Sequence, residues 1–62
     1  MVSLSLPIEL LVSILNTYLR SKYHSLCDLC EYENLDYEEL ISKLSNNSYQ
    51  YVDELNQIKP IN

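Results

Sequence analysis

The chain has 62 residues, a net charge of −5 and no glycine. This length suits one domain, near the lower size limit for a hydrophobic core that holds without disulfides or metals. The absence of glycine excludes glycine-rich phosphate loops and nucleophile elbows, and it leaves left-handed backbone positions to asparagine or to a strained residue. The negative charge argues against tight binding to bare nucleic acid or to an anionic membrane surface.

A first helix is expected over residues 7–22, with Pro7 in its first turn, where the missing N–H costs no hydrogen bond. Its apolar side chains have the spacing of a broad buried face, at Ile8, Leu11, Val12, Ile14, Leu15, Tyr18 and Leu19. The apolar stretch over 4–19 contains Glu9 and Asn16 and has no basic leader, so we expect neither a signal peptide nor a membrane span. This favours a cytoplasmic location, with free thiols at Cys27 and Cys30.

Two shorter helices are expected over residues 25–33 and 36–46. Ser25 and Asp36 are good N-cap residues, and Glu39 follows Asp36 at the spacing of a capping box. The predicted inner faces consist of Leu26, Leu29 and Cys30 in one helix, and of Leu40, Ile41 and Leu44 in the other. At the end of the third helix, Asn46 or Asn47 is expected to form a left-handed C-cap.

The C-terminal part is predicted to close over the core as a tail from Tyr49 to Ile58. Residues 49–52 alternate in polarity and indicate a short extended segment, and Asp53 is expected to cap a final helical turn. Leu55 and Ile58 are expected to point inward from that turn. We therefore predict a mainly α domain of three helices with frayed ends at residues 1–5 and 59–62.

The sequence also offers a candidate metal or redox site and a candidate DNA-binding motif. His24, Cys27 and Cys30 are a candidate metal or redox site. However, the two cysteines are a single ligand pair and lie in an acidic segment, so packing of Cys30 in the core is the favoured interpretation.

The second and third helices also match the outline of a helix-turn-helix DNA reader. However, residues 24–51 carry six acids against one lysine, a net charge of −5, and few basic groups remain for phosphate contacts.

The leading hypothesis is a non-enzymatic protein-interaction or regulatory module that binds no cofactor or metal. Tyrosine provides a large contact area at low entropic cost, so tyrosines of the third helix and the tail are candidate anchors for a protein partner. An alternative is that these tyrosines seal the small core. The candidate surface is formed by Tyr37, Glu38, Ser42, Lys43, Tyr49 and Tyr51. Whether a second copy of the chain contributes, as a homodimer, stays open.

The order of several short motifs resembles that of a family of short bacterial proteins known as a domain of unknown function, DUF 4250. The shared motifs are Leu6-Pro7, Asn16-Thr17, Leu19-Arg20, Leu29-Cys30, Leu35-Asp36, Tyr49-x-Tyr51 and Glu54-Leu55-Asn56-Gln57. Ser48 stands where the family pattern has glycine. The resemblance implies a stand-alone three-helix protein and no assigned activity. Fold roles are available for its polar members Asn16, Arg20, Asn56 and Gln57, as caps, turn bonds or a clamp between the first helix and the tail.

Overall fold

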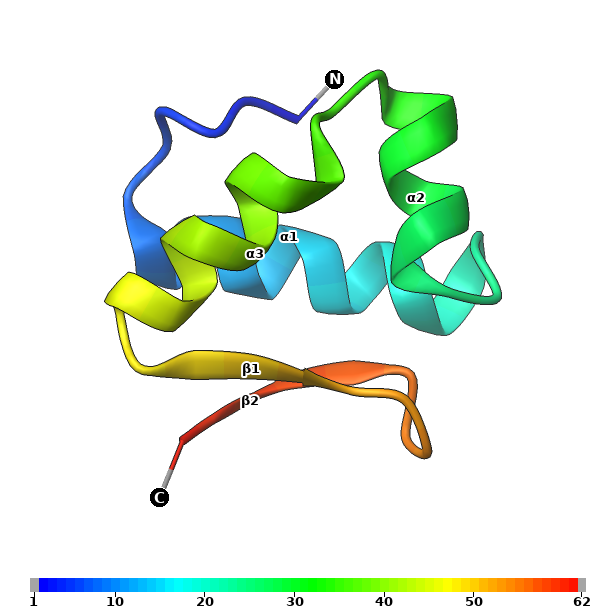
Figure 1. Ribbon diagram of the computed structural model, residues 1–62. Coiled ribbons are helices and arrows are strands. Elements are labelled where there is room, and N and C mark those ends of the chain that lie inside the picture. Colours follow the sequence, from blue (N-terminus) through cyan, green and yellow to red (C-terminus); the bar gives the residue numbers. More distant parts are fainter. Residues whose placement is uncertain (1, 62) are drawn as a thin grey trace.

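A computed structural model describes residues 2–61 and shows three helices followed by a β-hairpin (Figure 1). The elements are α1 (Ile8–Ser21), α2 (Leu26–Glu33), α3 (Tyr37–Asn46), β1 (Tyr49–Val52) and β2 (Gln57–Pro60). The helix bounds agree with the predicted ranges to within one residue at each end, if cap residues are counted. The prediction of three helices is therefore confirmed, whereas the tail is a two-stranded sheet.

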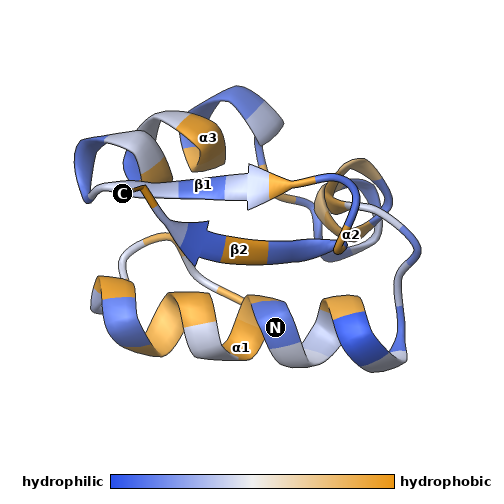
Figure 2. Ribbon diagram, turned by 90° about the horizontal axis from the view of Figure 1, so that it is seen from below, coloured by the Kyte–Doolittle hydropathy of each residue, from blue (hydrophilic) through white to orange (hydrophobic). Residues whose placement is uncertain are grey.

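The hairpin lies across one side of the helical layer. β1 contacts α3 and β2 contacts α1, so the two strands cover the space between these helices (Figure 2). The N-terminal segment passes over the opposite side of α1 and α3 (Figure 1). The core is enclosed between these layers. Its fully buried large side chains are those of Leu11, Leu15, Leu26, Leu29, Leu40, Leu44 and Ile58.

Local capping explains where the shorter helices begin. The Ser25 hydroxyl accepts a hydrogen bond from the Asp28 N–H at 3.1 Å, and this satisfies one free donor of α2. The Asp36 carboxylate accepts from the N–H groups of Glu38 and Glu39, at 3.0 and 3.2 Å. Pro7 is the N-cap residue of α1 and makes no side-chain cap hydrogen bond. Proline has no N–H, so the start of the helix leaves no unpaired donor at this residue.

The predicted helical turn after Asp53 is wrong, because the chain reverses there and forms a hairpin loop. Two tight turns close the loop, from the Leu55 N–H to the Val52 carbonyl and from the Asn56 N–H to the Asp53 carbonyl, both at 3.1 Å. Asn56 then takes a φ of 51°, and this left-handed step directs the chain back along β1. Leu55 lies at the loop tip and is 59% exposed instead of pointing inward, while Ile58 is buried as expected.

Left-handed positions fall on Asn34, Ser48 and Asn56 in this glycine-free chain. The choice of asparagine at two of them follows its tolerance of this conformation. The expectation of a left-handed Asn46 or Asn47 is wrong: Asn47 has a φ of −109°, and the left-handed residue is Ser48. The Asn47 side chain instead donates to the Lys43 carbonyl at 2.8 Å, so it closes the end of α3 by a side-chain bond.

Residues 1–5 and 59–62 were expected to fray, and some of the described ones among them take part in the fold. Val2 is buried in the core, and Lys59 and Pro60 pair with β1 in the sheet. Residues 1 and 62, which were also expected to fray, lie outside the described part of the chain. Among the helices within residues 2–61, none combines the length and the apolar character that are needed to cross a membrane.

Candidate functional site

A groove runs between α3 and β1, and we call it the α3–β1 groove. It brings together the three predicted anchor tyrosines, although they come from two different elements. Its lining consists of Tyr37, Ile41, Leu44 and Ser45 of α3, residues 49–51 of β1, Asp53 and Ile61. Among the described residues that line it, Asp53 alone carries a charge. The groove is therefore largely apolar and aromatic, with hydroxyl and amide groups interspersed.

The groove exposes apolar surface that the fold itself does not bury. Tyr37 is 40% exposed and Ile61 is 43% exposed, while Tyr49, Tyr51 and Ile41 are half-buried against the core. Desolvation raises the pKa of Tyr37 and of Tyr51 above the usual tyrosine value. Both phenols are therefore neutral at neutral pH, so they can donate and accept hydrogen bonds but are not poised to act as bases.

The Tyr51 hydroxyl fixes one wall of the groove by joining three segments. It donates to Asn56 Oδ1 at 2.6 Å and accepts from the Leu26 N–H, at the start of α2, at 3.3 Å. Asn56 Nδ2 in turn donates to the carbonyls of Leu19 and Tyr23, at 3.0 and 3.1 Å. The tyrosine is thus held by a polar network that neither interpretation of the tyrosines, as partner anchors or as seals of the core, foresaw. No local sequence motif signals this network. Its bonds to Leu26, Tyr23 and Leu19 join residues that are 25 to 37 positions apart in the sequence.

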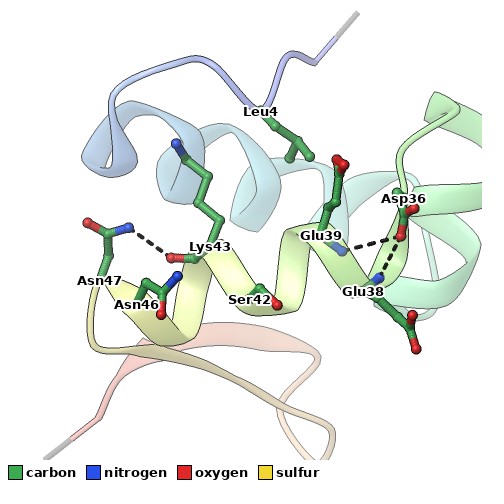
Figure 3. A pocket seen from close by; sticks show the side chains of 8 residues that line it. All are labelled: Leu4, Asp36, Glu38, Glu39, Ser42, Lys43, Asn46 and Asn47. Carbon is green, nitrogen blue, oxygen red and sulfur yellow. Dashed lines mark hydrogen bonds between the residues drawn. The ribbon is translucent and has the colours of Figure 1, made fainter.

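The other three predicted surface residues lie on a different face. Glu38, Ser42 and Lys43 line a shallow hollow beside the N-terminal segment, together with Leu4, Asp36, Glu39, Asn46 and Asn47 (Figure 3). Lys43 and Glu39 extend from α3 toward that segment (Figure 3). The helical repeat explains the separation, since Tyr37, Ile41 and Ser45 recur every four residues on one side of α3, while Glu38 and Ser42 are rotated away from them. The six predicted residues therefore form two surfaces.

The sequence model of a family described as a domain of unknown function, DUF4250, matches residues 7–58. This chain belongs to the DUF4250 family. The match includes all three helices, β1, the hairpin loop and the first two residues of β2. No curated protein matches the chain, and no solved structure does. The family description assigns no activity, so any functional argument depends on this chain's own surfaces.

The cysteines of this DUF4250 chain lie in different environments. Cys27 is exposed, whereas Cys30 is buried in the core, and both are free thiols. Burial raises the pKa of Cys30 to about 11, so its thiol is protonated at neutral pH. Within the described part of the chain, no three His, Cys, Asp or Glu side chains are grouped so as to hold a metal ion. His24, Cys27 and Cys30 are thus not brought together as the metal alternative requires.

The end of α3 that a helix-turn-helix protein would present to DNA is acidic. Asp36, Glu38 and Glu39 are all exposed there, and Asp36 uses its carboxylate to cap the helix. Lys43 lies two turns away and is only half-exposed. Backbone phosphates contribute most of the affinity in non-specific DNA binding, and carboxylates at this end repel them. Within residues 2–61, the charges at this end of α3 therefore disfavour DNA binding as an alternative to protein binding at the α3–β1 groove.

A second aromatic group, which the sequence did not indicate, packs around the end of α1. The Tyr23 ring stacks on Tyr32 with 5.9 Å between centroids and meets Tyr18 edge-to-face at 6.1 Å. Lys22 Nζ lies 5.0 Å from the Tyr18 centroid and 5.7 Å from that of Tyr23. The Tyr23 hydroxyl donates a short hydrogen bond to the Glu33 carboxylate. These contacts join α1 to α2 and satisfy one another, which favours a structural role.

Replacing Glu33 with glutamine is expected to lower the pKa of Tyr23. The hydrogen bond to the Glu33 carboxylate, which stabilises the neutral phenol, is the main reason that the pKa of Tyr23 is raised from 10.0 to about 12. Because the folded-state pKa is the higher one, the bond between Tyr23 and Glu33 stabilises the folded wild type fully below pH 10. That stabilisation is lost as the pH rises toward 12. A titration of the tyrosine ring ¹³Cζ shifts measures the change. Glu31→Gln, on the exposed side of α2, is the control, and an unchanged Tyr23 titration in the Glu33 variant contradicts the assignment.

Proposed function

We propose that this chain is a non-enzymatic protein-interaction module and that the α3–β1 groove is its contact surface. The observation that carries the proposal is the convergence of Tyr37, Tyr49 and Tyr51 on one groove beside exposed apolar side chains. Aromatic side chains of this kind dominate binding energy at protein interfaces, particularly where charged groups are scarce. A regulatory role follows if the bound partner is itself an effector protein.

The contacts that hold the groove in place support the proposal. β1 pairs with β2 and contacts α3, and the Tyr51 hydroxyl both donates and accepts a hydrogen bond. A partner that binds such a preformed surface loses less conformational entropy than one that must order it first. The hollow beside Leu4 offers less, because four of its eight lining residues are charged and they carry opposite signs. A protein partner is therefore expected at the α3–β1 groove first.

The proposal includes a cytoplasmic location and no bound cofactor. The two free thiols suit a reducing compartment, and the groove lining contains no histidine or cysteine and a single carboxylate. The pKa values of the two lining tyrosines with shifted titration, Tyr37 and Tyr51, are both raised, so neither phenol is poised to act as a general base near neutral pH. A second copy of the chain is another candidate partner.

Two matched serine variants of α3 test the groove. Ser45 and Ser42 are both exposed, but Ser45 lines the α3–β1 groove and Ser42 lines the hollow beside Leu4. A displayed library of random 12-residue peptides is selected on the wild-type protein, and the enriched peptides are then measured on Ser45→Arg and Ser42→Arg. We expect Ser45→Arg to weaken binding by about tenfold or more and Ser42→Arg to leave it within about twofold.

Circular dichroism melts of both variants show that each is folded before binding is compared. Equal binding to all three proteins would place the contact elsewhere and overturn the proposal. Loss in Ser42→Arg alone would move the site to the hollow beside Leu4. If no peptide is enriched above background in repeated selections, the groove is not a peptide-binding surface and the proposal fails as well.

A further inference from the structure

The two outer edges of the hairpin differ in their hydrogen bonding. On the β2 edge, the Ile58 N–H donates to Asn16 Oδ1 at 2.7 Å, and Asn16 Nδ2 donates to the Ile58 carbonyl at 3.0 Å. The next outward position on this edge is Pro60, which has no N–H. Side-chain capping and proline are two ways in which proteins prevent a strand edge from pairing with another chain. The β2 edge is therefore closed.

The β1 edge is open at two residues. In an antiparallel pair, opposed residues alternate between bonding each other and pointing their backbone groups away. Ile58 opposes Tyr51 and uses its backbone groups to bond Asn16, so Ile58 and Tyr51 do not bond each other. The pair Tyr49 and Pro60 lies two residues further along, so it is also a pair without mutual hydrogen bonds. The N–H and C=O groups of Tyr49 and Tyr51 therefore point away from β2. Within residues 2–61 none of them bonds to a residue outside the hairpin.

The two residues of the open edge, Tyr49 and Tyr51, both line the α3–β1 groove. Tyr37, Ile41 and Ser45 line the helical side at four-residue intervals, a span of about 12 Å at 1.5 Å per residue. The strand side from Tyr49 to Asp53 spans about 13 Å at 3.3 Å per residue. The two sides match in length, and α3 provides a wall beside unpaired backbone groups. Peptide-binding domains that add a strand to a sheet edge combine these same two features.

We infer that an extended segment of a partner protein binds this groove as a third strand, hydrogen-bonded to the backbone of Tyr49 and Tyr51. The inference rests on the proposed function and specifies how the groove binds its partner. Alternate side chains of the segment face the helical wall at Ile41, and the remaining ones face solvent. Main-chain bonds supply affinity, and the apolar wall selects the side chains.

Charge indicates the kind of segment. Asp53 is the charged residue of the groove lining and lies at the Val52 end of β1, and the chain carries a net charge of −5. An antiparallel third strand places its N-terminal end beside Asp53. The occupant is therefore an apolar, β-prone segment of another protein with a basic residue at its N-terminal end. A second copy of this chain is disfavoured, because it brings the same net charge of −5.

The probe is a synthetic blocked hexapeptide, acetyl-Lys-Thr-Val-Thr-Val-Thr-amide, added to ¹⁵N-labelled protein. In the free protein we expect faster amide exchange at Tyr49 and Tyr51 than at Gln50 and Val52, whose N–H groups face β2. Saturating peptide is expected to slow exchange at Tyr49 and Tyr51 by about tenfold or more and to leave Gln50 and Val52 unchanged. Moving the lysine to the C-terminal end is expected to weaken binding severalfold at low salt.

Alternate N-methylation of the peptide separates strand addition from side-chain binding. Methylating every second peptide nitrogen in one frame removes the donors that face β1, whereas the other frame leaves them intact. We expect about tenfold weaker binding or worse in the first case and little change in the second. Equal binding of both methylated forms, with sensitivity to Ser45→Arg retained, overturns strand addition but leaves the proposed interaction surface standing.

Two further outcomes also contradict the inference. Slow exchange at Tyr49 and Tyr51 in the peptide-free protein, with a tumbling time that grows with concentration, means that a second copy occupies the edge. Absence of any shift or protection along the groove at millimolar peptide means that the open edge does not accept a strand. In that case the peptide selection on the Ser45 and Ser42 variants decides separately whether the groove binds proteins in another way.

Discussion

Asn56→Ala is expected to lower the free energy of unfolding by about 3–4 kcal/mol. The Asn56 side chain accepts from the Tyr51 hydroxyl and donates to the carbonyls of Leu19 and Tyr23. Each such bond contributes about 1 kcal/mol. The residue also has a φ of 51°, a conformation that costs alanine about 1 kcal/mol. Urea unfolding followed by circular dichroism measures the loss.

Two variants separate the causes of that loss. Asn56→Gly removes the same hydrogen bonds but adopts the left-handed conformation without strain, so it should be about 1 kcal/mol more stable than Asn56→Ala. Asn34→Ala is the positional control, since Asn34 is also left-handed, with a φ of 60°, but is exposed at the end of α2. We expect it to cost about 1 kcal/mol. Equal losses at positions 34 and 56 would show that the network around Asn56 contributes little.

Such a loss is large for a chain of this size. Stability of about 0.05–0.15 kcal/mol per residue gives roughly 3–9 kcal/mol for a domain of 62 residues. The core consists mainly of leucines within one small cluster, and apolar burial rises slowly with chain length. Long-range polar bonds that hold the hairpin against the helices therefore form a substantial fraction of the net stability.

The helices were predictable because their signals are local. Ser25 and Asp36 accept hydrogen bonds from N–H groups two or three residues ahead, and this preference can be seen in the sequence alone. The buried positions likewise recur at helical spacing, as at Leu11, Leu15 and Leu19. A residue's own neighbours decide these features, so no knowledge of the tertiary fold is needed.

The hairpin was not predictable from the same signals. A turn that begins at Asp53 can continue as a helix or reverse the chain, and both outcomes begin with similar hydrogen bonds. The left-handed conformation of Asn56 and its bond to Leu19, 37 residues away, decide in favour of reversal. Absence of glycine indicated that asparagine would supply such positions, but it could not indicate that Ser48, and not Asn47, would do so after α3.

The candidate site was predictable by residue type but not by geometry. Tyrosines of α3 and the tail were expected to form one surface, and Tyr37, Tyr49 and Tyr51 do line one groove. Glu38, Ser42 and Lys43 were assigned to the same surface, yet the helix turns them to another face. The open β1 edge was not foreseeable, because it depends on which residues pair across the hairpin.

The clamp between α1 and the C-terminal part, one of the fold roles expected for Asn16, is present as a pair of bonds to the backbone of Ile58. Asn16→Asp is expected to lower the free energy of unfolding by about 2–3 kcal/mol at pH 7. The new carboxylate can still accept from the Ile58 N–H, but it has no donor for the Ile58 carbonyl and places a negative charge beside that oxygen. Ile58 itself is buried, so water compensates poorly.

Acid should restore much of this loss, and the pH dependence identifies the clamp. A protonated carboxyl presents one donor and one acceptor, as the amide does, so it can bond both backbone groups of Ile58. The folded-state pKa of the new carboxyl therefore lies above the ordinary value of about 3.9. The destabilisation relative to wild type is fully present above the folded pKa and disappears as the pH falls below the unfolded one.

Urea unfolding of wild type and Asn16→Asp at several pH values between 3 and 7 measures this difference. Thr17→Ala is the matched control on the same helix, because the Thr17 hydroxyl bonds only within α1, to the Ser13 carbonyl at 3.0 Å. Its effect should stay within about 0.5 kcal/mol at every pH. A constant difference between wild type and Asn16→Asp across the range would contradict the paired bonds to Ile58. The closed β2 edge would then need another explanation, whereas recovery in acid ties that edge to the Asn16 side chain.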